Sequence, residues 1–324
     1  MDNCARNGEK LRAGVLSMAR GWAERGLVEP AFLDWLEDEG RVSFPWSMID
    51  KITPHPSERV QEELGRLGVA DMAIARTNTG TLIAPFVNAE ITEYLVLEDA
   101  FPNGRPALEG AGVYLTDRTT VEKAEKMKVG TCLNPLHTAL AVYGCLLGYT
   151  SIAAEMGDAD LKALVEQIAA ESLPVVEDPG ILSPRAFIDE VLHERFPNPA
   201  IPDTPQRIAA DTSQKLPVRY GGTLRRYARQ SEQALAGLEF APLVFAGWCR
   251  YLLGVDDRGN AMPVSPDPML PQLQAHLKGI EVGRPDSLAG QLRPILSNAA
   301  LFGVDLYAAS LLYTSDAADD SLRV

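Results

Sequence analysis

Between residues 119 and 301 the sequence keeps returning to a helical pattern, and this constrains the fold more than any other feature. Apolar residues recur there at spacings that place them on one face of a helix. The pattern covers these segments: 119–128, 135–149, 158–172, 184–195, 216–231, 234–254, 268–279 and 285–301. Proline and glycine lie in the connections, where they end helices. The sequence therefore predicts a helical domain over residues 123–311.

Residues 1–122 differ because they mix helical and extended patterns. Four apolar residues near the start recur at helical spacing: Leu11, Val15, Met18 and Trp22. Further elements are expected in this part: a short helix after Pro30, a helix over 57–67, and strands over 81–87 and 91–97. The stretch FPWSMIDKITPHP contains three prolines and is expected to form a loop. The fold class predicted for the whole chain is mainly α with a small α/β part.

Charge and composition narrow the classes of function. The chain has 44 acidic and 30 basic residues, a net charge of −14, so it lacks the basic surface that nucleic acid requires. It has no basic amphipathic helix for a membrane surface, no apolar run long enough to span a bilayer, and no signal peptide. Its four cysteines are far apart and form no CxxC pair: Cys4, Cys132, Cys145 and Cys249. We therefore expect reduced thiols and a cytoplasmic protein.

The densest group of chemically useful side chains is KVGTCLNPLH, from Lys128 to His137. Asn134 followed by Pro135 predicts a helix start, with Asn at the N-cap and Pro at the first helical position. His137 then lies on the same side of the first turn as Asn134, and Lys128 ends the preceding helix. Such a group could exchange a proton with a substrate oxygen and polarise it. A surface lysine, a capping asparagine and a structural histidine would explain the same residues.

Other chemistries have weaker support in the sequence. There is no HExxH, G-x-S-x-G or P-loop motif. Cys132 and His137 have no second pair of ligands, so we expect no zinc or other metal. Cys132 beside His137 could act as a thiol nucleophile, but a small buried apolar residue is the better interpretation.

The segment KMKVGTCLNPLHTALAVYG resembles the lysine–asparagine–histidine signature of the polyol-specific long-chain dehydrogenases, the mannitol dehydrogenase family. Further segments resemble the family in the family's order: DNCARNG, FPWSMIDKITP, EYLVLEDAFPNGRP and TPQRIAADTSQKLPVR. The resemblance runs from residue 2 to about residue 309. It implies the remnant of a Rossmann-type domain, followed by a helical domain similar to the C-terminal domain of 6-phosphogluconate dehydrogenase. It also implies NAD-dependent hydride transfer at a secondary alcohol, without a metal.

The resemblance assigns roles to individual residues. Lys128 resembles the general acid/base, Asn3 and Asn134 the amides that hold the reacting oxygen, His137 the substrate-orienting histidine, and Asp50 an acidic residue of the same pocket. Arg207 and Lys215 match a basic pair that holds the far end of the substrate. Glu125, one helical turn before Lys128, could tune or relay its proton. A solvated pair at a helix end would also explain Arg207 and Lys215, and a surface ion pair would explain Glu125. We expect the substrate residues to converge on one pocket at the domain junction.

Two features depart from the family pattern. The spacing from Lys128 to Asn134 is one residue longer than the family's commoner spacing, with Gly130 as the candidate extra residue. No GxGxxG follows a strand, and Gly110-Ala-Gly112 is the nearest approach. The family carries its dinucleotide-binding domain before the point where this chain begins, so the resemblance leaves the cofactor-binding residues unassigned. It implies a fragment that is short at both ends and inactive by itself. Residues 312–324 are expected to be a non-native or disordered tail.

The segments NPLHTALAVYGCLLGY and DTSQKLP most resemble the sequences of the family members that interconvert fructuronate and mannonate. We therefore expect NAD as cofactor and a sugar acid or polyol as the small-molecule partner. A mannitol-type or other polyol 2-dehydrogenase is an alternative, because the wider family keeps a pair such as Arg207 and Lys215 for neutral polyols. A non-catalytic helical interaction domain that has lost its cofactor half is a second alternative.

Overall fold

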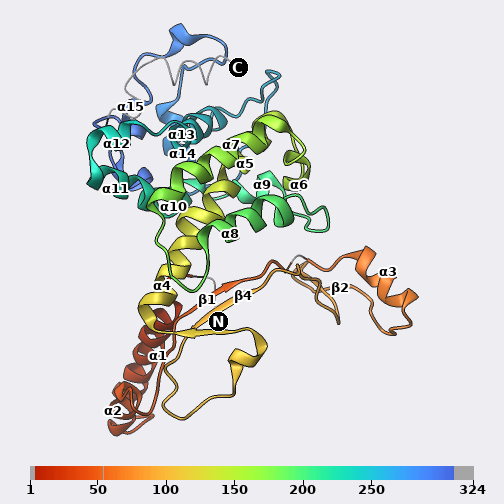
Figure 1. Ribbon diagram of the computed structural model, residues 1–324, viewed down its shortest axis with the longest axis vertical. Coiled ribbons are helices and arrows are strands. Elements are labelled where there is room, and N and C mark those ends of the chain that lie inside the picture. The colour runs from red at the N-terminus through yellow and green to blue at the C-terminus, as the bar shows by residue number, and fades with distance from the viewer. Residues whose placement is uncertain (1–3, 54, 310–324) are drawn as a thin grey trace. The chain divides into compact units, whose positions relative to one another are not determined.

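The computed structural model describes residues 4–53 and 55–309 (Figure 1). The chain forms two compact units. The first unit runs to Glu125 and includes Pro179–Ile181, and the second holds Lys126–Asp178 and the residues from Leu182 onward. Asn3 and the predicted tail 312–324 lie outside the described residues. The predicted fold class, mainly helical with a small mixed sheet, is confirmed.

The first unit combines a helix pair, a small sheet and several short elements. Its elements are α1 (Asn7–Glu24), α2 (Ala31–Glu37), β1 (Ser47–Asp50), α3 (Glu58–Arg66), β2 (Ala75–Arg76), β3 (Leu82–Ile83), β4 (Tyr94–Glu98), the 3₁₀ turn η1 (Leu108–Ala111), β5 (Tyr114–Thr116) and α4 (Arg118–Met127). β4 lies between β1, which is antiparallel to it, and β5, which is parallel. The helices predicted near Pro30 and over 57–67 are thus present as α2 and α3.

Two expectations for the first unit are wrong. The proline-rich stretch expected to be a loop contains β1, whose Met48 pairs with Val96 of β4, and both side chains are buried. A four-residue strand is stabilised by a partner distant in sequence, so local composition does not show it. The strand expected over 81–87 is reduced to Leu82–Ile83, because Pro85 cannot donate a ladder hydrogen bond.

The start of α1 is fixed to β1 by an asparagine. Asn7 Nδ2 donates to the backbone and side-chain oxygens of Ser47, both at 2.9 Å, and Asn7 Oδ1 accepts from Ser47 N at 3.0 Å. Gly8 permits this approach, because a Cβ at that position would lie 2.3 Å from the carbonyl oxygen of Phe44.

The helix predicted from Leu11, Val15, Met18 and Trp22 is present as α1, but of these residues only Val15 packs on its buried face. Leu16 and Ala19 are buried and pack with Leu36 of α2. Leu11 is 60% and Met18 61% exposed. The apolar spacing therefore predicted the helix correctly, but not the side of it that α2 covers.

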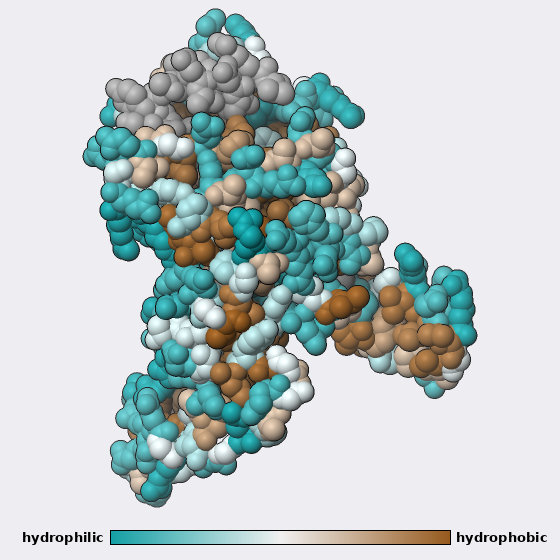
Figure 2. Space-filling model, in the orientation of Figure 1, coloured by the Kyte–Doolittle hydropathy of each residue, from teal (hydrophilic) through white to brown (hydrophobic). Residues whose placement is uncertain are grey.

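A segment of the first unit, which we call the arm (residues 55–92), carries α3 and the β2–β3 pair. In Figure 1 it extends away from the ends of β1 and β4. α3 has no buried residue. Figure 2 shows brown, apolar surface on this segment. The large apolar side chains exposed there are Leu67, Val69, Ile83, Val87 and Ile91.

The second unit consists of helices joined by short connections. Its elements are the π-helical turn η2 (Lys128–Cys132), α5 (Asn134–Leu147), α6 (Ile152–Glu155), α7 (Ala159–Ser172), η3 (Leu173–Val175), α8 (Pro184–Glu190), the π-helical turn η4 (Val191–Arg195), α9 (Pro205–Ile208), α10 (Thr212–Arg219), α11 (Gly221–Gln230), α12 (Glu232–Ala236), α13 (Phe240–Tyr251), α14 (Leu270–His276), η5 (Pro285–Ser287), α15 (Arg293–Leu296) and α16 (Ala299–Phe302). Four predicted helices correspond to more than one element: 184–195 to α8 and η4, 216–231 to α10 and α11, 234–254 to α12 and α13, and 285–301 to η5, α15 and α16. Positive φ at Gly290 and prolines at the starts of η5 and α15 explain the last division.

α5 is the central helix of the second unit. It packs against α7, α9 and α13 (Figure 1), and ten of its 14 residues are buried. Gly144 lets α6 approach, because a Cβ there would lie 2.1 Å from Glu155 Oε1. No helix in the described ranges is long and apolar enough to cross a membrane.

Candidate active site

Lys128 opens the π-helical turn η2 between α4 and α5, and it is 3% exposed. Leu133 N donates to Lys128 O at 3.1 Å, a bond that spans five residues instead of four. The wider turn accommodates one residue more than an α-helical turn, which explains the long spacing from Lys128 to Asn134. Thr223 Oγ1 donates to Gly130 O at 3.2 Å and so ties the turn to α11.

The expectation that Asn134 caps α5 is wrong. Asn134 is the first residue of α5, the preceding position is Leu133, and no side chain caps this end. His137 N donates to Leu133 O at 3.0 Å, so the helical bonding begins one residue earlier than the sequence indicated. Among the described residues, the Asn134 side-chain amide has no hydrogen-bond partner, so it is available to a ligand.

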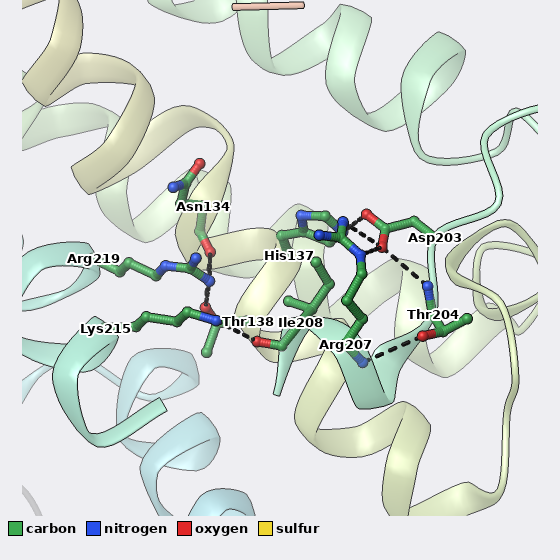
Figure 3. Close-up of polar contacts among 9 residues, drawn as sticks. All are labelled: Asn134, His137, Thr138, Asp203, Thr204, Arg207, Ile208, Lys215 and Arg219. Atoms are coloured by element: carbon green, nitrogen blue, oxygen red, sulfur yellow. Dashed lines mark hydrogen bonds and ion pairs between the residues drawn. The ribbon is translucent and has the colours of Figure 1, made fainter. Parts of the chain in front are cut away.

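His137 and Arg207 meet on one buried carboxylate, Asp203 (Figure 3). His137 Nε2 lies 3.2 Å from Asp203 Oδ2, and Arg207 reaches Oδ1 through Nε at 2.8 Å and Nη2 at 2.6 Å. The Asp203 side chain is only 6% exposed, whereas that of Arg207 is 64% exposed. Asp203 thus fixes both side chains, which come from α5 and α9.

Burial and the Asp203 carboxylate act in opposite directions on the protonation of His137. Burial would raise the pKa of Asp203, but hydrogen bonds from His137 and Arg207, together with the charge of Arg207, outweigh it and hold the pKa below its ordinary value. Burial lowers the pKa of His137, although Asp203 opposes this effect. His137 is therefore a neutral imidazole at pH 7 that donates Nε2–H to Asp203, and Nδ1 is left as a hydrogen-bond acceptor.

Two more cations project from α10 toward the start of α5 (Figure 3). Lys215 Nζ donates to the backbone oxygens of Ile208, at 3.0 Å, and Ala210. Arg219 Nη1 donates to Thr138 Oγ1 at 2.6 Å and lies 3.4 Å from Asn134 O. Both side chains contact neutral oxygens, not carboxylates.

The predicted site residues are thus only partly brought together. Asn134, His137, Arg207 and Lys215 lie in one group (Figure 3), and η2, which carries Lys128, packs against α5 and α10. Asp50 is buried at the end of β1 in the first unit, and Glu125 lies on α4. Asn3 is outside the described residues. Convergence of all the substrate residues on one pocket stays a prediction.

Sequence reasoning missed Asp203 and Arg219. Each is four residues from a basic residue that was identified, Asp203 before Arg207 and Arg219 after Lys215. Lys215 and Arg219 can share one face of α10, so for Arg219 the spacing was an available signal, whereas Asp203 precedes α9. Only the tertiary contacts to His137 and Thr138 distinguish them from surface charges.

The remaining candidates do not support another chemistry. Cys132 is buried and its Sγ lies 3.7 Å from Pro184 O, and burial raises the pKa of this thiol to about 12, so it is a poor nucleophile. No group of His, Cys, Asp and Glu suited to a metal ion occurs within residues 4–53 and 55–309. A cavity of about 770 Å³ lies in the first unit, beside Arg6, Trp46 and Arg118, and none of the residues of the second unit lines it.

Comparison with known proteins confirms the family resemblance. Residues 120–315 match the model of the mannitol dehydrogenase C-terminal domain. The chain is 56% identical to D-mannonate oxidoreductase of Thermotoga maritima over 96% of its own length and 58% of the relative's, and 32% identical to the Escherichia coli D-mannonate oxidoreductase over 94% and 56%.

The fold is also similar to a solved structure, the Pseudomonas fluorescens mannitol 2-dehydrogenase ternary complex with NAD and D-mannitol. The TM-score is 0.67 at 29% sequence identity, over 99% of this chain and 60% of the other. The chain thus spans less than two thirds of the length of the relatives described. On the family model and these relatives, the chain belongs to the mannitol dehydrogenase family.

Proposed function

We propose that this chain provides the substrate-binding and proton-transfer part of an NAD-linked dehydrogenase that interconverts fructuronate and mannonate. The observation that carries the proposal is the buried Lys128, held on a π-helical turn beside the polar group of Asn134 and His137. π-Helical turns are frequent at functional sites, and a lysine is rarely buried unless its charge has a specific partner or use. The 56% identity to the Thermotoga D-mannonate oxidoreductase supports the choice of substrate.

In this proposal Lys128 is the general acid/base. During reduction of the ketone, Lys128 Nζ gives a proton to the carbonyl oxygen as the carbon gains a hydride, so that a C–H and an O–H bond replace the C=O π bond. During oxidation the hydroxyl returns the proton to Lys128. The Asn134 amide, together with Asn3, stabilises negative charge on the same oxygen. The acceptor Nδ1 of His137 orients a neighbouring hydroxyl, and the family resemblance assigns Asp50 a further role toward the substrate.

The proposed cofactor is NAD because the similar mannitol 2-dehydrogenase structure is a complex with NAD. A dinucleotide site would need a glycine-rich turn between a strand and the start of a helix, where the pyrophosphate is held. Gly110 and Gly112 instead lie at the 3₁₀ turn η1, which precedes β5. The described residues therefore do not fit the pyrophosphate, and the proposal assigns no cofactor contact to them.

The similarity to the mannitol 2-dehydrogenase complex favours a second candidate, in which a neutral polyol is the substrate. The proton-transfer roles of Lys128 and Asn134 would be the same. The two candidates differ only in what holds the far end of the substrate, where a sugar acid carries a carboxylate and a polyol a hydroxyl.

The proposal is tested with a hybrid in which this chain replaces the matching part of the Thermotoga relative. We expect Lys128→Ala to lower kcat for fructuronate reduction by roughly 10²–10⁴-fold with little change in KM, because proton transfer acts in the transition state. Lys126→Ala is the control, since Lys126 is exposed on the preceding turn. An unchanged kcat in the Lys128 variant would refute the assigned role.

The chain without such an addition is expected to show neither tight NADH binding nor fructuronate reduction. A fluorescence titration with NADH and a turnover assay measure both. Saturable binding in the micromolar range would show that a cofactor site lies within these residues after all. Sugar-acid binding without turnover in the hybrid would favour the non-catalytic alternative.

A further inference from the structure

The candidate site carries more positive charge than its own carboxylates neutralise. Arg207, Lys215 and Arg219 all belong to it, whereas Asp203 is the carboxylate that forms ion pairs within it. Asp203 engages Arg207 through two nitrogens. Over the described ranges, Lys215 and Arg219 form no ion pair, although the whole chain carries a net charge of −14.

Lys215 and Arg219 are one helical turn apart on α10, so their side chains lie on the same face. In Figure 3 both reach toward the first turn of α5, where Asn134 and His137 are placed. The bonds to Thr138 and Ile208 fix the two cations without an ion pair, and among the described residues only the more distant Asp211 and Asp267 offset the charge of Lys215. Cations held in this way can form charge-assisted hydrogen bonds to an anionic ligand.

The electrostatics of the pair agree with this geometry. Burial, and then repulsion by Arg219, lower the pKa of Lys215 to about 8, with Arg207 adding to the effect and Asp211 and Asp267 opposing it. Burial lowers the pKa of Arg219 to about 10. A ligand carboxylate would oppose the repulsion that acts on Lys215, and its attraction would favour the charged forms of both side chains.

We infer that Lys215 and Arg219 together bind the carboxylate of the substrate, and that Arg219 is the residue that separates a sugar acid from a neutral polyol. This inference rests on the proposed function and extends it, because the basic pair expected from the sequence was Arg207 and Lys215. Arg207 already forms an ion pair with Asp203. We therefore assign Arg207 to positioning the Asp203 carboxylate and, through that carboxylate, His137.

A purely structural role for Arg219 makes a different prediction. If Arg219 only fastened α10 to α5 through Thr138 and Asn134, its loss would loosen the site for every ligand. If it binds a carboxylate, its loss weakens acid ligands alone. Two ligands that differ at a single terminal group therefore separate the two roles.

The experiment measures dissociation constants of D-mannonate and D-mannitol for the 324-residue chain by calorimetry or by NMR titration. We expect the unmodified chain to bind D-mannonate more tightly than D-mannitol. Arg219→Gln should weaken D-mannonate by about 10- to 100-fold and leave D-mannitol unchanged, because a hydrogen bond to a charged group is lost. Arg219→Lys should restore part of the affinity. The control is Arg229→Gln, which removes an exposed charge from α11.

The outcomes separate the inference from the proposed function. A chain that binds D-mannitol as tightly as D-mannonate, or an Arg219→Gln variant that weakens both ligands equally, overturns the inference and leaves a dehydrogenase of polyols. A folded chain that binds neither ligand overturns both. Circular dichroism of each variant shows whether the helices are retained, and Arg219→Lys provides a folded comparison if the glutamine variant is unstable.

Discussion

Helices α3 and α5 both follow the helical patterns predicted from the sequence, but they lie in very different surroundings. α5 has ten buried residues and forms the centre of the second unit, whereas α3 has none and lies on the arm of the first unit. Most of a helix's stability in a protein comes from packing of its apolar face. The comparison teaches that an apolar pattern predicts a helix but not whether anything packs against it.

The core around α5 also orients the polar side chains of the candidate site, which a loosely packed region such as the arm could not do. Asn134 and His137 belong to the first turn of this helix, and Asp203 and Arg219 contact them from neighbouring elements. Close packing on α7, α9 and α13 keeps that turn in place, which is what a site of fixed geometry requires. The arm, by contrast, presents large exposed apolar side chains, and large exposed apolar patches are typical of interaction surfaces.

The largest expected effect compares one leucine from each region. Leu140 of α5 is 0% exposed and Leu67, at the end of α3, is 73% exposed. Leu140→Ala should lower the free energy of unfolding by about 2–5 kcal/mol, because it removes buried contacts and leaves a cavity. Leu67→Ala should change it by less than about 0.5 kcal/mol. Urea unfolding followed by circular dichroism measures both, and equal losses would mean that the arm is packed in solution.

The second prediction concerns Glu155, a buried acid beside Gly144. The two carboxylate oxygens of Glu155 have no hydrogen-bond partner among the described residues. Burial, with a smaller contribution from Asp203, raises its pKa to about 9. The folded protein then keeps a proton that the unfolded chain releases near its ordinary value of 4.5, so stability falls as pH rises between about 4.5 and 9.

Glu155→Gln removes this titration. We expect it to raise the free energy of unfolding at pH 7 by about 3 kcal/mol at most, and to flatten its decline between pH 5 and pH 9. Glu166→Gln is the matched control, because Glu166 is exposed on α7. If the two variants showed the same pH dependence, Glu155 would be an ordinary ionised carboxylate.

The same comparison shows what the sequence could predict. Asn134, His137, Arg207 and Lys215 were identified from motifs, and the structure groups them because the motifs lie on α5, α9 and α10. β1, the bond from Thr223 to the π-helical turn and the contact of Asp203 with His137 could not be predicted, since each depends on residues far away in the chain. The position of Asn134 in its helix was missed for a related reason, because the bond from Leu133 to Lys128 shifts the helix start by one residue.

The third prediction concerns Lys215 and the pH dependence of ligand binding. Its pKa is lowered to about 8, so the free lysine loses its charge between pH 7 and pH 9. Affinity for D-mannonate should therefore fall by about tenfold over that range, while affinity for D-mannitol stays constant. Lys215→Arg should move the decline to higher pH. A decline of the same size for both ligands would instead indicate a change in the protein.

The smallest expected effect on stability returns to the arm. Ile91 is 99% and Val87 78% exposed. Replacing both with lysine removes no buried contact, so the free energy of unfolding should change by less than about 0.5 kcal/mol for each substitution. Solubility should nevertheless increase, because charged residues interrupt an exposed apolar patch. Light scattering at increasing protein concentration measures this change.

The control for that experiment places lysines on the arm without removing apolar surface, at Glu62 and Glu63 of α3, which are exposed and pair with Arg66. Glu62→Lys with Glu63→Lys changes the net charge by twice as much as the apolar replacements, since each position passes from negative to positive. If solubility followed net charge alone, both variants would lower it, the control more, because lysines bring the net charge of −14 closer to zero. If it followed the apolar patch, only the Ile91 and Val87 variant would raise it. The second result would show that the arm, unlike α5, exposes a surface suited to burial.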